Sequence, residues 1–346
     1  MRILVTGASG FIGSFIVSTG LDLGYEMWAG MRQGSSRQYL TDPQTHFAEL
    51  DLGNLERLQQ QLLAYKEEMG GAWDYVIHAA GATKSLTREG FFRTNTDGTR
   101  NLVKALRATD MVPQRFVFIS SLSVFGAIKE TPVRGEKKRI YEPITASDSP
   151  EPNTAYGESK LAAEHYLQSL SDFPWVILRP TGVYGPRERD YFLMAKSIKQ
   201  HVDFAVGYKP QEITFVYVLD VVQAAFLCCK QPAERVLHHA YFLSDGESYD
   251  SRAFSDLLQR EIGTRYVLHI KAPLWFLRAV CAVNGKVCQW FRKLTTLNMD
   301  KYHILAQRNW NCDIEPAKRE LGYRPKWDLE HGVHETVKWY KQAGWL

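Results

Sequence analysis

The sequence has few cysteines and no pattern that would make them ligands. Its 346 residues include five cysteines, at positions 228, 229, 281, 288 and 312. Their spacing matches no metal-binding pattern, and their odd number suits reduced thiols better than a disulfide framework. The first apolar strand begins at the N-terminus, which leaves no room for a signal peptide. We therefore predict a cytoplasmic protein without a metal site.

The sequence also lacks an apolar run long enough to cross a membrane. Its most apolar stretch, residues 273–291, is interrupted by Arg278, Asn284 and Lys286, whereas a span needs roughly 20 apolar residues. We predict an amphipathic helix that covers a substrate cleft or contacts a partner. Contact with a bilayer surface or a lipid-like substrate is the alternative.

Neither sign of charge is in large excess. The net charge is +4, from 42 basic and 38 acidic residues, and the basic run at residues 136–139 is too short to indicate a nucleic-acid site. A hydrophobic content of 45% is typical of a folded globular protein, and the length allows a full α/β core. These values predict no nucleic-acid partner.

A glycine-rich turn follows the first apolar strand. Residues 3–5 are Ile-Leu-Val, and residues 6–13 read Thr-Gly-Ala-Ser-Gly-Phe-Ile-Gly. In a dinucleotide-binding turn the first glycine permits the sharp bend, the second lets the backbone approach the phosphates, and the third lets the helix lie close to the strand. The helix N-terminus then faces the diphosphate. The predicted dinucleotide-binding residues are Gly7, Ser9, Gly10, Phe11, Ile12 and Gly13.

The second predicted strand, residues 26–32, bears on the identity of the dinucleotide. An acidic residue at its end binds the ribose hydroxyls of NAD, whereas an arginine accommodates the 2′-phosphate of NADP. Arg32 stands at this end and Arg37 follows, with no carboxylate between them. We favour NADP over NAD. The alternative is that both arginines are merely solvated.

Strands and helices alternate through the first half of the chain. Further strands are predicted at residues 46–52, 74–81, 115–121 and 175–180, the last of the series. This alternation predicts an α/β fold with a Rossmann-type, doubly wound parallel sheet in a domain spanning residues 1–185. Beyond it we predict a smaller, mixed α/β substrate-binding region at residues 186–346, with a possible return to the first domain near residues 213–230.

Two strand ends carry residues suited to a cofactor. Asp51 ends the strand at 46–52, where it could bind the adenine amine. The small residues Ala79, Ala80 and Gly81 leave room for the nicotinamide half of the dinucleotide. We expect His78, just before them, to be a core histidine and not a catalytic one.

Three polar residues form a candidate catalytic set. Tyr156 and Lys160 stand four residues apart on a predicted helix, so they share one face, and Ser121 ends the strand at 115–121. A phenol with a pKa of about 10 is a poor base at neutral pH. A nearby ammonium lowers that pKa and makes tyrosine a usable acid/base, while the serine hydroxyl could hold a substrate oxygen.

Further motifs accompany the glycine turn and the candidate catalytic set along the chain. They lie at residues 51–52, 78–81, 95, 98–102, 120–126, 179–187, 215–221 and 317–325. In this order they resemble the extended short-chain dehydrogenases/reductases of the NAD(P)-dependent epimerase/dehydratase family. The resemblance runs nearly end to end.

The resemblance implies functional residues. It implies a cofactor held by the glycine turn, Asp51, Leu52, Ala79, Ala80, Gly81, Asn95, Tyr156, Lys160, Pro180 and Val183. It implies Ser121 as the serine of the triad, with Ser123 as its nearest competitor, and a contribution of Asn95 through a bound water. Family members commonly dimerise through the helices carrying Asn95 and Tyr156, so a homodimer is possible.

Departures from the family pattern disfavour dehydration and weaken the case for a nucleotide-diphosphate substrate. Family dehydratases carry an Asp-Glu pair directly after the triad hydroxyl, where this chain has Leu122 and Ser123. Nucleotide-sugar members often carry an arginine just before the strand at 215–218, where this chain has Gln211 to Thr214. Arg32 and the apolar helix are similar to those of dihydroflavonol reductases and 3β-hydroxysteroid dehydrogenases, which act on bulky hydrophobic alcohols and ketones.

We therefore expect an NAD(P)-dependent dehydrogenase or reductase acting on an alcohol, ketone or sugar-like substrate. Tyr156 would exchange the proton, Lys160 would tune Tyr156 and bind the nicotinamide ribose, and Ser121 would orient the substrate oxygen. Two alternatives stay open: a nucleotide-sugar epimerase with tightly bound NAD, and a non-enzymatic NAD(P)-binding redox sensor.

Overall fold

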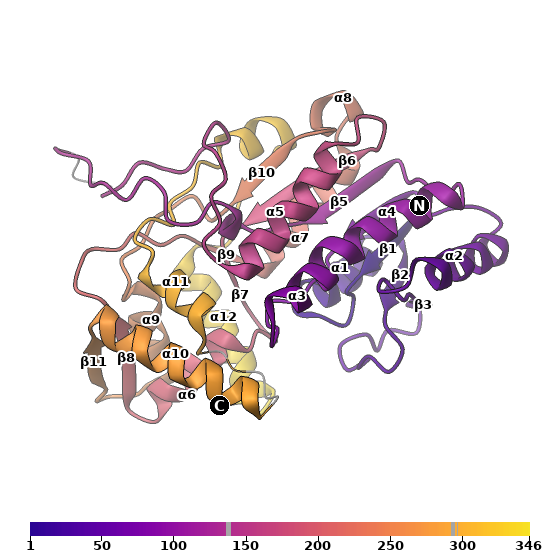
Figure 1. Cartoon of the computed structure of the whole chain (residues 1–346). Coiled ribbons are helices and arrows are strands. Elements are labelled where there is room, and N and C mark those ends of the chain that lie inside the picture. Colours follow the sequence, from indigo (N-terminus) through magenta and orange to yellow (C-terminus); the bar gives the residue numbers. More distant parts are fainter. Residues whose placement is uncertain (136–139, 292–294, 296) are drawn as a thin grey trace.

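A seven-stranded parallel sheet forms the centre of the protein. The computed structural model describes residues 1–135, 140–291, 295 and 297–346 (Figure 1), so the basic run at 136–139 lies outside the described residues. The strand order is β10-β6-β5-β4-β1-β2-β3, and every neighbouring pair is parallel. The strands are β1 (Arg2–Thr6), β2 (Glu26–Met31), β3 (His46–Glu49), β4 (Tyr75–His78), β5 (Arg115–Ile119), β6 (Trp175–Pro180) and β10 (Ala240–Leu243).

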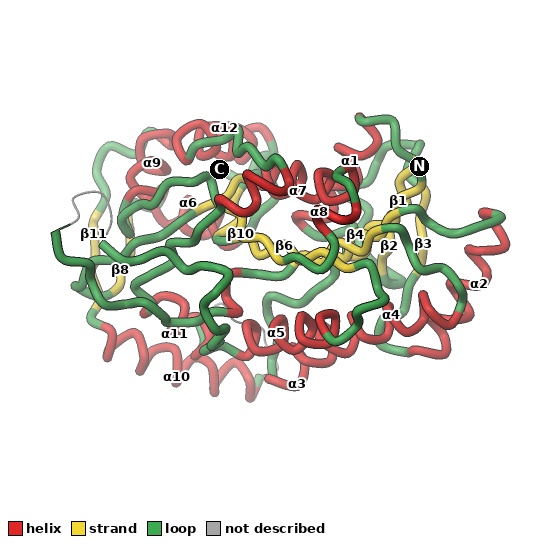
Figure 2. Tube along the Cα trace, turned by 90° about the horizontal axis from the view of Figure 1, so that it is seen from above, coloured by secondary structure: helices red, strands yellow, loops and turns green. Residues whose placement is uncertain are grey.

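Helices cover both faces of this sheet (Figure 2). One face packs on α1 (Phe11–Asp22) and α7 (Val218–Lys230), and the other on α2 (Leu55–Met69), α4 (Gly98–Ala108) and α5 (Ala155–Gln168). The strands are apolar on both sides because alternate residues point to opposite faces: Ile3 and Val5 join one core cluster and Leu4 joins the other. This is the predicted fold class, which the structure confirms.

The remaining elements build a smaller region against one end of the sheet and the connections around it. Two small parallel pairs occur, β7 (Gly182–Tyr184) with β9 (Phe215–Tyr217), and β8 (Val202–Val206) with β11 (Leu268–Ala272). The other helical elements are α3 (Arg88–Phe91), η1 (Phe92–Asp97), η2 (Leu122–Val124), α6 (Asp190–Lys199), α8 (Ala233–Val236), α9 (Ala253–Ile262), α10 (Leu274–Trp290), α11 (Met299–Ala306), η3 (Ala317–Leu321) and α12 (Leu329–Gln342).

One prediction about the sheet is wrong. The strand at 175–180 is not the last of the series, because β10 pairs with it as a seventh strand. About sixty residues separate the two strands, and the four residues of β10 carry no distinctive pattern, so chain order did not reveal the pairing. The chain also returns to the first sheet through α7, which packs on α1.

The order of the parallel strands indicates which edge of the sheet binds a ligand. The connections run in opposite directions on the two sides of the boundary between β1 and β4, and open α/β sheets bind ligands at the carboxyl ends of the strands beside such a boundary. The glycine turn after β1, the small residues after β4 and the serines after β5 all follow carboxyl ends at this edge.

Candidate active site

The glycine turn has the backbone geometry that a diphosphate cradle needs. Gly7 has a φ of 69°, and a Cβ added to it would lie 2.6 Å from the Cα of Ala80. A Cβ on Gly13 would collide with the carbonyl oxygen of Gly7. Gly10 stands at the N-cap of α1 and has no side chain to bond the first-turn N–H groups. Ser9 completes the turn, and Phe11 and Ile12 begin α1, so this terminus fits an anionic group.

The predicted adenine-side residues follow β2 and β3. Arg32 directly follows β2 and is exposed, and Arg37 is also exposed with its guanidinium 3.9 Å from the centre of the Phe47 ring. An Asp51 carboxylate oxygen accepts a hydrogen bond from the backbone N–H of Gly53 at 3.1 Å. These residues flank the strands that lie beside the glycine turn.

Leu52 and the residues after β6 are held by contacts within the chain. The Leu52 carbonyl accepts a hydrogen bond from the side chain of Asn101 at 2.9 Å. Pro180 ends β6, and Val183 lies in β7, where it pairs with Val216. Along the chain, Leu52 comes before β5, and Pro180 and Val183 come after it.

The small residues after β4 lie beside the predicted triad. The backbone N–H of Ala79 bonds the Thr6 carbonyl at 3.2 Å, and that of Ala80 bonds the Thr6 hydroxyl at 3.4 Å. A Cβ on Gly81 would lie 3.4 Å from the Lys160 ammonium nitrogen. Gly81 is therefore packed closely against Lys160, where a larger residue would be crowded.

Asn95 connects the loop after β4 to helix α5. It lies in η1, a π-helical segment, and its side chain accepts from the N–H of Ala82 at 2.7 Å and donates to the Ala82 carbonyl and the Ser159 hydroxyl. Such π-helical turns often occur at functional sites. The structure thus gives Asn95 a positioning role in holding the Gly81 loop against α5.

Helix α5 brings the candidate triad together. Thr154 caps the helix, Tyr156 stands in its first turn, and Lys160 lies one turn later with 4% of its surface exposed. The Lys160 ammonium donates to the carbonyl oxygen of Ile119 at 2.7 Å. Ser121 follows β5 as the N-cap of η2, and its hydroxyl lies close enough to Tyr156 to lower the pKa of the phenol. Ser123 donates its backbone N–H to the Ser121 hydroxyl at 3.1 Å.

The electrostatics of the triad differ from the prediction. Burial raises the pKa of Tyr156, and the neighbouring Ser121 hydroxyl offsets only part of that effect. Burial lowers the pKa of Lys160 to about 8, against a smaller raising effect of Glu164. The expected lowering of the tyrosine pKa by the lysine is therefore not found, because Lys160 points to Ile119 and both side chains are desolvated.

Comparisons with known proteins agree with this geometry. Residues 3–243 match the NAD dependent epimerase/dehydratase family. The chain belongs to this family. Members are NAD(P)-dependent dehydrogenases, reductases, epimerases and dehydratases, and the glycine turn of this chain fits the dinucleotide that they use.

Individual relatives span several of the family's activities. The chain is 23% identical to a ceramide reductase of Caulobacter vibrioides, over 99% of this chain and 96% of the relative. It is 26% identical to a UDP-glucose 4-epimerase of Vibrio cholerae, over 99% and 96%. The crystal structure of dTDP-glucose 4,6-dehydratase from Bacillus anthracis in complex with NAD has the same fold, with a TM-score of 0.74 and 18% identity over 99% and 97% of the two chains.

A buried ion pair behind the triad of this family member was not predicted. Glu164 is fully buried one turn after Lys160, and its carboxylate accepts three hydrogen bonds from Arg179, the shortest at 2.6 Å. The Ser120 hydroxyl donates to the same carboxylate. The only sequence signal for this ion pair was the four-residue spacing of two charged residues, Lys160 and Glu164, on one predicted helix.

A second unpredicted contact holds the N-terminus of α5. Asp300, in α11, accepts the backbone N–H groups of Ala155 and Tyr156 at 3.2 and 3.3 Å. A carboxylate stabilises a helix N-terminus by pairing with its unbonded N–H groups. No local pattern could have revealed this contact, because 144 residues separate Tyr156 and Asp300.

His78 is a core residue, as predicted. Its two ring nitrogens bond the hydroxyls of Thr6 at 2.6 Å and Thr99 at 2.9 Å. Complete burial lowers its pKa to about 3, with a smaller effect of Lys160. A neutral imidazole with both nitrogens occupied joins β1, β4 and α4 and has no free proton-transfer position.

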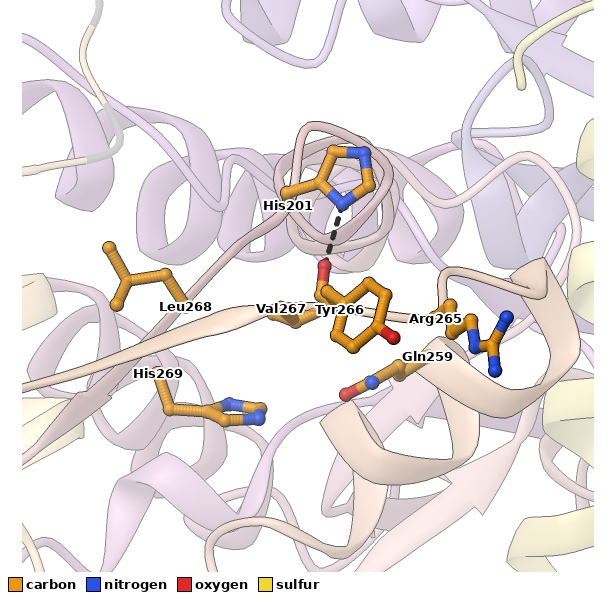
Figure 3. A pocket seen from close by; sticks show the side chains of 7 residues that line it. All are labelled: His201, Gln259, Arg265, Tyr266, Val267, Leu268 and His269. Carbon is orange, nitrogen blue, oxygen red and sulfur yellow. Dashed lines mark hydrogen bonds between the residues drawn. The ribbon is translucent and has the colours of Figure 1, made fainter.

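Two surface hollows lie away from this family site. One, of about 520 Å³, is lined by His201, Gln259 and residues 265–269 (Figure 3), and the other, of about 550 Å³, lies between α9 and the start of α12. In the first, a ring nitrogen of His201 lies 2.6 Å from the backbone carbonyl oxygen of Tyr266. Both are lined entirely by residues of the C-terminal half, and neither includes a residue of the candidate triad.

Proposed function

We propose that the protein is an NAD(P)-dependent dehydrogenase or reductase that acts on a bulky, hydrophobic alcohol or ketone. The observation that carries the proposal is the placement of Tyr156 and Lys160 in adjacent turns of α5, with Ser121 close to Tyr156 and Gly81 packed against Lys160. This places two hydroxyl groups and an ammonium at the carboxyl edge of the sheet, where the nicotinamide half of the cofactor is expected.

Each residue has a distinct role in this proposal. The cofactor, when bound, supplies or accepts the hydride. Tyr156 donates a proton to the ketone oxygen or takes one from the alcohol, and Ser121 orients that oxygen by a hydrogen bond. Lys160 binds the nicotinamide ribose, and its ammonium is already held in place by the Ile119 carbonyl.

The surroundings of the triad support net redox chemistry over dehydration. The position after Ser121 is Leu122, whose side chain is 1% exposed and packs in the core. The next, Ser123, has no carboxylate. A pair of carboxylates that could remove water from a sugar is therefore not available at these two positions.

The region before β9 supports a substrate without a diphosphate. Glu212 is 3% exposed, and its carboxylate accepts the backbone N–H groups of Ile140 and Tyr141 and the hydroxyl of Ser248. A fixed carboxylate disfavours an anionic ligand nearby, where an arginine would favour it. This is the specific reason to place epimerisation of a nucleotide sugar second.

We propose NADP as the preferred cofactor, supported by Arg32 and Arg37 at the end of β2. The dehydratase of the same fold contains NAD, so the choice is a property to measure in this chain. The five free cysteines suit a reducing compartment, and we propose a cytoplasmic enzyme, with a homodimer through η1, α4 and α5 as one arrangement to test.

The test is to purify the protein, denature it and identify any released nucleotide. We expect none at stoichiometric level, binding of NADPH in preference to NADH, and oxidation of NADPH when bulky ketones are added. Replacing Arg32 and Arg37 by serine should reduce that preference.

Three results would contradict parts of this proposal. Release of one equivalent of NAD per chain would favour the epimerase, in which the cofactor is regenerated in each turnover. Equal affinity for NADH and NADPH would refute the roles of the arginines. Cofactor binding without turnover of any alcohol or ketone would favour the redox sensor.

A further inference from the structure

Helix α10 exposes a continuous apolar surface. Five residues on its outward side are among the most exposed large apolar side chains: Trp275 (72%), Phe276 (49%), Val283 (63%), Val287 (49%) and Trp290 (86%). They lie on one side because their spacings follow the helical repeat. We call these five residues the apolar stripe.

Packing against the described residues does not account for the apolar stripe. On its other side α10 packs on α11, with Leu277 8% exposed and Cys281 fully buried. The helix is thus anchored through one side and runs along the outside of the molecule (Figure 1). Apolar surface of this extent commonly marks an interaction site.

The charges on α10 indicate an anionic partner surface. The sequence of the helix contains no aspartate or glutamate, and its two charged residues, Arg278 and Lys286, are both exposed. Tryptophans stand near its two ends, at positions 275 and 290. Tryptophan and basic residues beside an apolar surface are typical of helices that lie in the headgroup layer of a bilayer.

The length of α10 suits lying on a membrane and not crossing it. Its 17 residues would extend about 25 Å, less than the roughly 30 Å of a hydrocarbon core. Among the described residues, no helix is long and apolar enough to span a bilayer.

A second copy of the chain fits the apolar stripe less well. A two-fold contact about the middle of α10 would bring Arg278 and Lys286 of one helix toward the same residues of the other, and both are cations. Like charges close together in an interface oppose association, whereas anionic lipid headgroups neutralise them.

From these observations we propose that α10 is an interfacial helix that docks the protein on the surface of an anionic bilayer. The apolar stripe enters the boundary between headgroups and acyl chains, and the two basic residues contact the headgroups. Docking in this way does not depend on the proposed function. If that function holds, docking brings the active site to a hydrophobic substrate that partitions into the bilayer.

A short chain of contacts connects α10 to the catalytic helix. The helix packs on α11, and Asp300 of α11 holds the first-turn N–H groups of Ala155 and Tyr156 in α5. The docking helix and the catalytic tyrosine are therefore joined through a single intervening helix.

The experiment is flotation of the full-length protein with vesicles of phosphatidylcholine alone or containing phosphatidylserine. The apolar variant is W275S/W290S and the charge variant is R278E/K286E. The matched control is L63S/L193S, which replaces leucines of α2 and α6 that are 53% and 50% exposed. Each variant is first shown to have the circular dichroism spectrum and thermal unfolding of the natural chain, so that loss of folding is not mistaken for loss of docking.

We expect binding to vesicles that contain phosphatidylserine, little binding to phosphatidylcholine alone, and natural binding by the control. Each basic residue near an anionic surface strengthens binding about fivefold, so the charge variant should bind about twentyfold more weakly or worse. The apolar variant should also lose binding.

Three outcomes would overturn the proposal. They are no binding to either vesicle, equal binding to both with no effect of the charge variant, or a vesicle-independent dimer that the apolar variant dissociates. All three leave NADPH oxidation untouched, so failure of docking and failure of the proposed function are distinguishable.

Discussion

The buried ion pair behind the triad gives the sharpest test of how the site is supported. Glu164 is fully buried in α5, and its carboxylate is bonded by Arg179 and Ser120. Replacing Glu164 by glutamine keeps the shape of the side chain and removes its charge. The guanidinium of Arg179, itself 5% exposed, is then left buried without a counter-ion.

The expected loss of stability is large. Removing one partner of a buried ion pair costs about 3–5 kcal/mol, because the remaining charge is desolvated without compensation. The control is Glu158→Gln on the same helix, which breaks an exposed pair with Arg88 whose side chains are 35% and 59% exposed. Such surface pairs contribute about 0–1 kcal/mol.

Glu164→Gln should also move the titration of Lys160. The Glu164 carboxylate raises the pKa of Lys160 and so offsets part of the lowering by burial. Without it, that pKa falls below about 8. Since the protonated lysine is lost as pH rises through its pKa, the alkaline limb of kcat/KM for the cofactor should shift to lower pH.

The two measurements are urea denaturation followed by circular dichroism, and a pH–rate profile. The reasoning fails if Glu164→Gln and Glu158→Gln lose the same small stability. It also fails if the stability falls as expected while the alkaline limb stays where it is in the natural protein, because Glu164 would then support the fold without acting on Lys160.

Further predictions concern single groups. Tyr156→Phe should lower kcat by about 10²–10⁴-fold, the usual contribution of a general acid/base, and leave the Kd for NADPH nearly unchanged in a fluorescence titration; an unaltered kcat would remove Tyr156 from the mechanism. The pKa of Lys160 is about 8 in the folded protein and 10.5 when unperturbed. The unfolded chain therefore binds more protons between these values, and the free energy of unfolding without cofactor should rise by up to about 3 kcal/mol over that pH range. Lys160→Met should abolish this rise in denaturation curves, and persistence of the rise would assign it to another group. Gly13→Ala should weaken NADPH binding and cost about 1–3 kcal/mol, because the added methyl meets the carbonyl of Gly7. Gly71→Ala, where a Cβ would lie 3.8 Å from its nearest neighbour, is the matched control, and equal effects of the two substitutions would contradict the packing argument.

The glycine turn between β1 and α1 was predictable because its determinants are local. Gly7 and Gly13 lie six residues apart, and the strand and helix around them are continuous with the turn. The same holds for Tyr156 and Lys160, whose spacing within one helix already brings them to one face. Short-range spacing of this kind is visible in a sequence.

Other features depend on contacts between distant segments. The strand β10 pairs with β6 after a connection of about sixty residues, and Asp300 reaches the start of α5 from α11. The raised pKa of Tyr156 depends on how much protein surrounds the phenol, which spacing does not reveal. These features required the folded structure.

The same distinction explains why motifs leave the substrate open. The side chains of the region before β9 are placed by long-range contacts, as when Glu212 is held by the N–H groups of Ile140 and Tyr141, about seventy residues earlier. In the function that we propose, that buried carboxylate disfavours a diphosphate at a position where nucleotide-sugar members of the family often carry an arginine. A search that begins with neutral, apolar ketones therefore follows from a feature that is particular to this chain, and not from the dinucleotide-binding motifs that it shares with epimerases and reductases alike.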